Sequence, residues 1–69
     1  MLICHIHNFE LKFEIDNSTE QQVNEIIRIL KLYSVEYVKG DMYLVIRGLK
    51  YELYEILFNL SRNYDITLI

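Results

Sequence analysis

The segment from residue 49 to residue 62 is expected to form a helix with apolar side chains on two opposite faces. At about 100° per residue, one face carries aliphatic side chains only, namely Leu49, Leu53, Ile56, Leu57 and Leu60. The opposite face carries Tyr51, Tyr54 and Phe58, spaced i, i+3 and i+7. A chain of 69 residues forms a single domain, residues 1–69, with one core. Only one face can pack on that core, so the aromatic stripe is expected to be exposed or to contact another chain.

The small size of the chain favours association. A core of this size contributes only a few kcal/mol, so such chains usually need disulfides, a metal, dense packing or a partner. Cys4 is the only cysteine, which excludes a disulfide within the chain. The hydrophobic fraction is 52%, and so small an interior leaves some of these side chains near the surface. The composition therefore predicts a homodimer or a subunit of a protein complex.

The charge and the first residues exclude several classes of partner and location. The formal net charge is −3, and the 7 basic residues are scattered, whereas binding to a phosphate backbone requires clustered lysine and arginine. Direct binding of nucleic acid is therefore not expected. The sequence contains no run of about 18 apolar residues, so no membrane span is predicted. The first residues lack the pattern of a signal peptide, and together with a free cysteine this favours the cytoplasm.

The first strand has an irregular alternation. Apolar and charged side chains alternate over residues 9–16, which predicts a strand with one face in the core. In residues 2–6 the apolar side chains stand at even positions, so the alternation slips near His7 and Asn8. A bulge or a tight turn would explain the slip. Because His-Asn is a weak turn pair, we expect one long bent strand, with its core face formed by Phe9, Leu11, Phe13 and Ile15.

A first helix is expected after residue 17. Asn17 with Glu20, or Ser18 with Gln21, has the spacing of a capping box, which satisfies the open amides at a helix start. The apolar stripe of this helix is Val23, Ile26, Ile27, Leu30 and Tyr33, widened by Ile29 and Leu32.

The remaining elements define the predicted fold. Residues 35–39 and 42–47 are rich in strand formers and are joined by Gly40-Asp41, which predicts a hairpin with positive φ at Gly40. Residues 64–68 alternate again and predict a last strand. The order β-α-β-β-α-β is that of the ferredoxin-like fold. We therefore predict an α+β sandwich, with two helices packed on one face of a four-stranded, mostly antiparallel sheet.

Residues 39–46 partly resemble the RNP1 motif of RNA-recognition modules, through Lys39-Gly40 and Tyr43-Leu44. That family stacks bases on aromatic side chains, but Asp41 and Ile46 stand at two of the aromatic positions. The outer face of the first strand also offers only charged side chains. The resemblance therefore does not predict RNA binding.

The outer sheet face supports an alternative function. It is expected to surround apolar Val38, Tyr43 and Val45 with acidic side chains, which could mimic phosphate groups and occupy a basic groove. The chain has no alanine or proline and many Ile, Asn, Tyr and Lys residues, a bias typical of A/T-rich genomes, phages and plasmids. The alternative prediction is a small acidic inhibitor of phage or plasmid type, which blocks a nucleic-acid-handling protein such as a host defence nuclease. Its acidic residues would be Glu10, Glu14, Glu36 and Asp65.

Only one cluster has the residue types of a metal or catalytic site. On a strand, His5 and His7 would share a face about 7 Å apart and could clamp a transition metal. Zinc needs further ligands, and beyond Cys4 no other Cys or His exists, so acidic residues would have to complete the site. Cys4 itself points away from both imidazoles and is expected to be a structural residue. No phosphate loop is present, so we predict no enzyme, no cofactor and no metal site.

The aromatic stripe of the second helix is therefore the predicted partner-binding surface. Tyrosine combines a large apolar area with a polar tip, and for this reason it often anchors interfaces. Charged residues beside the stripe would form a polar rim. The competing interpretation is a helix with a different phase, or a first strand folded over the stripe. The predicted partner-binding residues are Tyr51, Tyr54, Phe58, Glu55 and Arg62.

Overall fold

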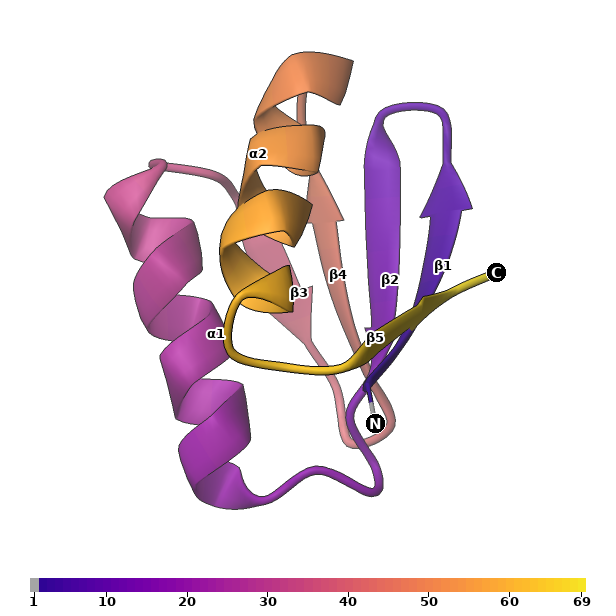
Figure 1. Ribbon diagram of the computed structural model, residues 1–69, viewed down its shortest axis with the longest axis vertical. Helices are drawn as coiled ribbons and strands as arrows, with labels where there is room; N and C mark the ends of the chain where they lie inside the picture. The colour runs from indigo at the N-terminus through magenta and orange to yellow at the C-terminus, as the bar shows by residue number, and fades with distance from the viewer. Residues whose placement is uncertain (1) are drawn as a thin grey trace.

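A computed structural model of the chain describes residues 2–69, which form five strands and two helices (Figure 1). Both helices lie on the same side of the sheet and contact each other (Figure 1). The α+β class is therefore as predicted. The strands are β1 (Leu2–His7), β2 (Glu10–Glu14), β3 (Tyr37–Lys39), β4 (Tyr43–Arg47) and β5 (Ile66–Leu68), and the helices are α1 (Glu20–Leu32) and α2 (Lys50–Ser61).

The sheet has five strands in the order β3-β4-β2-β1-β5. Strands β1 and β5 are parallel, whereas the other neighbours are antiparallel, so the sheet is mixed. The predicted four-stranded sheet with ferredoxin-like order is not confirmed. Strand β1 occupies the position beside β2 that the last strand has in that fold, and β5 pairs with the outer edge of β1 instead. The connection through α2 therefore crosses two strands, β2 and β1.

A tight turn at Asn8 and Phe9 creates the additional strand. His7 pairs directly with Glu10, so two residues connect β1 and β2. Phe9 closes this turn with a φ of 62°, in the left-handed region that bulky side chains rarely adopt. The expected single bent strand is therefore wrong. Phe9 was predicted in the core, but it lies at the tip of the hairpin with 60% of its surface exposed.

The hairpin explains the slip in the apolar alternation. Cys4 pairs with Phe13 across β1 and β2, and Phe13 pairs with Leu44 of β4. Paired residues share a face, so a two-residue connection places even positions of β1 beside odd positions of β2. Cys4, Phe13 and Leu44 form one row on the helix-facing side, and each is 0% exposed. The slip near His7 therefore marks a turn rather than a bulge.

Helix α1 is capped by Thr19, one residue after Ser18 and two after Asn17, which were the predicted caps. The Thr19 Oγ1 atom accepts a hydrogen bond from the Gln22 amide at 3.2 Å, and the Gln22 side chain accepts one from the Thr19 amide at 3.1 Å. The predicted pairs at residues 17/20 and 18/21 are therefore wrong in position, although the capping box itself is present. Leu32 is 73% exposed and does not widen the core stripe. The buried residues of α1 are Val23, Ile26, Ile29 and Leu30.

Helix α2 has the predicted phase but starts one residue later. Leu49 was predicted on the core stripe, but it is the N-cap residue and is 52% exposed. Its side chain has no oxygen for capping, and its amide donates instead to Glu52 Oε1 at 3.4 Å. The remaining aliphatic residues of the predicted stripe are buried, as expected: Leu53, Ile56, Leu57 and Leu60.

The predicted hairpin of β3 and β4 is present, but its turn differs. Neither Gly40 nor Gly48 has positive φ. The connection runs over residues 40–42, and the Gly40 amide donates to the Tyr43 carbonyl at 2.8 Å. No residue of this connection has positive φ, so it is neither a two-residue turn of the primed type nor the common three-residue loop with one left-handed residue. The prediction of positive φ at Gly40 is therefore wrong.

The position of the α1 cap can be tested with Thr19→Ala. Removing an N-cap hydroxyl costs about 1 kcal/mol, so the free energy of unfolding in urea should fall by this amount. Asn17→Ala is the matched control, because Asn17 is exposed and lies before the cap. Unfolding is monitored by circular dichroism. An equal loss of the free energy of unfolding in both variants would contradict the assigned cap.

The backbone of Phe9 can be tested in the same way. Asparagine tolerates the left-handed region better than phenylalanine, and Phe9 is exposed, so little packing is lost. Phe9→Asn should therefore raise the free energy of unfolding by about 0.5 to 1 kcal/mol. Phe9→Ala keeps the strain and should give no such gain. A loss of stability in Phe9→Asn would show that the ring contributes packing that outweighs the strain.

Candidate functional site

The aromatic stripe of α2 faces away from the core. Tyr51, Tyr54 and Phe58 are 66%, 50% and 62% exposed, whereas the opposite face of the helix is buried. Strand β1 lies within the sheet and does not fold over the stripe. The exposure predicted from the helical spacing is therefore confirmed. Binding of a partner by these residues stays a prediction.

A groove extends the stripe from α2 onto β5. Its volume is about 310 Å³, and Leu68 on its β5 side is 54% exposed. We call the exposed aromatic stripe together with this groove the α2–β5 surface. An aromatic stripe beside an apolar groove provides both side chains that can be inserted and a space that can receive them. The groove is lined by Tyr54, Leu57, Phe58, Ser61, Ile66 and Leu68.

Strand β5 is placed at the groove by its pairing with β1. The Leu2 amide donates to the Asp65 carbonyl at 2.8 Å, and the Ile69 amide donates to the Cys4 carbonyl at 2.9 Å. In a parallel ladder, alternate residues direct their backbone groups to the same neighbour. Ile66 and Leu68 therefore direct theirs toward the open edge, since no strand lies beyond β5 in the described part of the chain. The role of Ile66 and Leu68 in the groove could not be predicted from the sequence, because their alternation predicts a strand but not its neighbours.

Two charged residues flank Phe58, as predicted for a polar rim. The Arg62 guanidinium lies over the Phe58 ring, 4.8 Å from its centroid, which is a cation–π contact. Glu55 is exposed one turn earlier. Within residues 2–69, neither Glu55 nor Arg62 takes part in an ion pair. Both charges are therefore available to a binding partner.

The outer face of the sheet carries compensated charges. Strand register places Glu10, Lys12, Glu14 and Tyr43 on this face, as predicted. The His5 Nε2 atom lies 2.5 Å from Glu14 Oε2. The Lys12 ammonium lies 4.1 Å from the centroid of the Tyr43 ring. Basic groups of the same face therefore accompany the acidic ones.

Glu10 is paired in the same way. Its Oε1 atom accepts a hydrogen bond from Arg47 Nε at 3.1 Å, and Arg47 lies directly opposite on β4. Glu10 thus already faces a cation of this chain, and Glu14 already contacts the His5 imidazole. Within residues 2–69 the other two acidic residues of this alternative, Glu36 and Asp65, take part in no ion pair, so the acidic-inhibitor function stays a prediction.

Cys4 is buried in β1, as expected of a structural cysteine. Burial raises the pKa of its thiol to about 12, against a smaller opposite effect of a hydrogen bond with the Lys12 backbone. A thiol with so high a pKa is a poor nucleophile at neutral pH. His5 lies on the other face of the sheet with Glu14. Among residues 2–69, no group of three Cys, His, Asp or Glu side chains could hold a metal ion.

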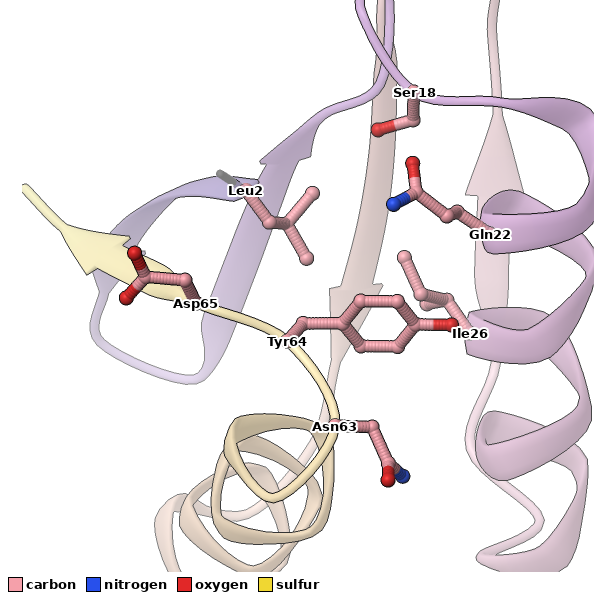
Figure 2. A pocket seen from close by; sticks show the side chains of 7 residues that line it. All are labelled: Leu2, Ser18, Gln22, Ile26, Asn63, Tyr64 and Asp65. Atoms are coloured by element: carbon pink, nitrogen blue, oxygen red, sulfur yellow. The ribbon is translucent and has the colours of Figure 1, made fainter.

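A second hollow, of about 200 Å³, lies between α1 and the segment leading into β5 (Figure 2). The Tyr64 ring crosses this space toward α1 (Figure 2). The hydroxyl donates a hydrogen bond to Glu25. Partial burial and this hydrogen bond raise the pKa of Tyr64 to about 12. Tyr64 therefore links the approach to β5 with α1 and does not exchange its proton near neutral pH.

Comparison of the chain with protein-family models, with curated proteins and with solved structures finds no match. Neither helix of the described residues is both long enough and apolar enough to cross a bilayer. The function proposed next therefore depends on the residues of this chain alone.

The raised pKa values predict a loss of stability in alkaline solution. The pKa of Cys4 rises from 9.0 and that of Tyr64 from 10.0, each to about 12, so the fold favours both protonated side chains. This contribution is fully present below about pH 9 and is lost as the pH rises through about 12. Urea unfolding should give a lower free energy at pH 11 than at pH 8. Between these pH values, the free energy of unfolding should fall less in Cys4→Ala than in the wild type. An equal fall in both would show that the thiol is not involved.

Proposed function

We propose that this chain is a cytoplasmic protein–protein interaction module, which acts as a homodimer or as a small subunit of a protein complex. The observation that carries this proposal is the exposure of Tyr51, Tyr54 and Phe58, at 50–66%, on one face of α2. Single exposed apolar residues are common on monomers and need no explanation. Three aromatic residues on one helix face, continuous with an apolar groove, form a contiguous patch of the kind that marks interaction sites.

The chemistry of the patch matches that of interface centres. Tyrosine and arginine are enriched among residues that dominate binding energy, and they act best when surrounding contacts exclude water. The α2–β5 surface contains Tyr51 and Tyr54, with Arg62 stacked on Phe58. A partner that covers the groove would remove these rings from water and would gain the free energy of apolar burial. Binding is thus favoured without any catalytic group.

Tyr54→Glu tests this function. A buried carboxylate at the centre of the surface should weaken association by about 2 kcal/mol or more, which is about thirtyfold. Association is measured by sedimentation equilibrium of the purified chain and by quantitative co-purification of bound proteins. Because Tyr54 is 50% exposed in the single chain, the free energy of unfolding should change by less than about 0.5 kcal/mol.

Leu32→Glu is the matched control. Leu32 is also an exposed apolar helix residue, at 73%, but it lies on α1 rather than on the α2–β5 surface. This variant should associate like the wild type. If Tyr54→Glu and Leu32→Glu both bind at wild-type strength while remaining folded, the aromatic stripe is not the interaction surface.

A further inference from the structure

We propose that the occupant of the α2–β5 surface is a second copy of this chain. The two α2 helices would pack antiparallel about a two-fold axis near Phe58 and Ser61. This inference rests on the proposed function, because it names the partner of the same surface. The charges on the surface favour this antiparallel arrangement over the alternatives.

The exposed face of α2 has the spacing of a helix–helix seam. Counting from Phe58, Tyr51 lies seven residues before it, Tyr54 four before it, and Ser61 three after it. Alternating steps of three and four residues keep side chains on the line along which two helices pack. The helix therefore offers a continuous seam over its whole length, from Tyr51 to Ser61.

Ser61 gives the seam a space for an aromatic ring. Its side chain is small and lines the groove beside Phe58. Its hydroxyl donates a hydrogen bond to the Phe58 carbonyl at 2.8 Å, so the polar group is already satisfied. Covering this hydroxyl with an apolar ring therefore leaves no unpaired donor. Phe58 of the partner subunit can pack against Ser61 and into the groove, and a two-fold axis repeats this contact.

Charge complementarity fixes the direction and the register of the helices. Glu55 and Arg62 lie seven residues apart, on the same side of the seam and on either side of Phe58. Antiparallel packing about Phe58 and Ser61 brings Glu55 beside Arg62 of the partner subunit, and symmetry forms the same pair twice. Neither residue has an ion-pair partner within residues 2–69. Arg62 can form this pair from its position over the Phe58 ring.

The alternative arrangements lack the two Glu55–Arg62 pairs. An axis one turn earlier, near Ile56, would place Tyr54 against Phe58 of the partner subunit. It would also bring the two copies of Glu55 toward each other. A parallel arrangement would place the side of the seam that carries Glu55 and Arg62 across from the opposite side of the partner's seam, so neither pair would form. Repulsion between the two copies of Glu55 disfavours the first alternative, and the second forms no Glu55–Arg62 pair, so the charges favour the arrangement about Phe58 and Ser61.

A charge swap with sedimentation equilibrium tests this arrangement. The wild type should approach twice its mass of 8.4 kDa as its concentration rises. Glu55→Arg and Arg62→Glu should each raise the dimer dissociation constant by about tenfold, because each loses two pairs and opposes two like charges. The double variant Glu55→Arg/Arg62→Glu restores opposite charges and should return to within about threefold of the wild type.

Glu36→Arg is the matched control for net charge, because Glu36 is exposed and lies outside the α2–β5 surface. It should dimerise like the wild type, and circular dichroism should show that every variant is folded. Dimerisation without rescue in the double variant would overturn the proposed register.

A wild type that is monomeric at all concentrations would overturn self-association. If Tyr54→Glu then loses a different, co-purifying protein that Leu32→Glu retains, the interaction module stands and only its occupant was misassigned. If the wild type dimerises and neither Tyr54→Glu nor the charge variants weaken the dimer, both the function and the inference are wrong.

Discussion

The two-residue turn at Asn8 and Phe9 holds the sheet together, because it places β1 between β2 and β5. Through this turn, β1 forms ladders on both of its edges, antiparallel with β2 and parallel with β5. Cys4 thereby enters the same core row as Phe13. The turn requires left-handed backbone at Phe9, a cost that is offset by two strand ladders and a closed core. Without β1, β5 would have no neighbour and the groove beside α2 would lose one wall.

The size of the core determines what remains outside it. One face of α2 is filled by Leu53, Ile56 and Leu60, which pack between the sheet and α1. No further layer of the described chain covers the other face, so Tyr54 and Phe58 stay exposed. A larger domain could bury both faces of such a helix. The α2–β5 surface thus follows from a two-faced helix in a fold with one sheet.

Periodicity predicted the local features of the fold well, including the two helices, the β3–β4 hairpin and the phase of α2. It could not decide between a bend and a turn at His7, since both shift the apolar alternation by one position. The weak turn pair His-Asn argued against a turn, but tertiary pairing imposes left-handed backbone on Phe9. The groove was also beyond prediction, because Ile66 and Leu68 line it only when β5 pairs with β1. That pairing joins residues at opposite ends of the sequence.

The pairing of β5 with β1 also has a consequence for the order of folding. The outer edge of β1 stays open until Ile66–Leu68 dock onto it, whereas the β1–β2 and β3–β4 hairpins join residues close in sequence. Docking of β5 depends on both α2 and β1 being in place, so we expect it to come late. The groove then exists only in the finished molecule. A folding intermediate that already has α2 would display aromatic side chains but no groove, so recognition that depends on the groove would distinguish complete molecules from incomplete ones.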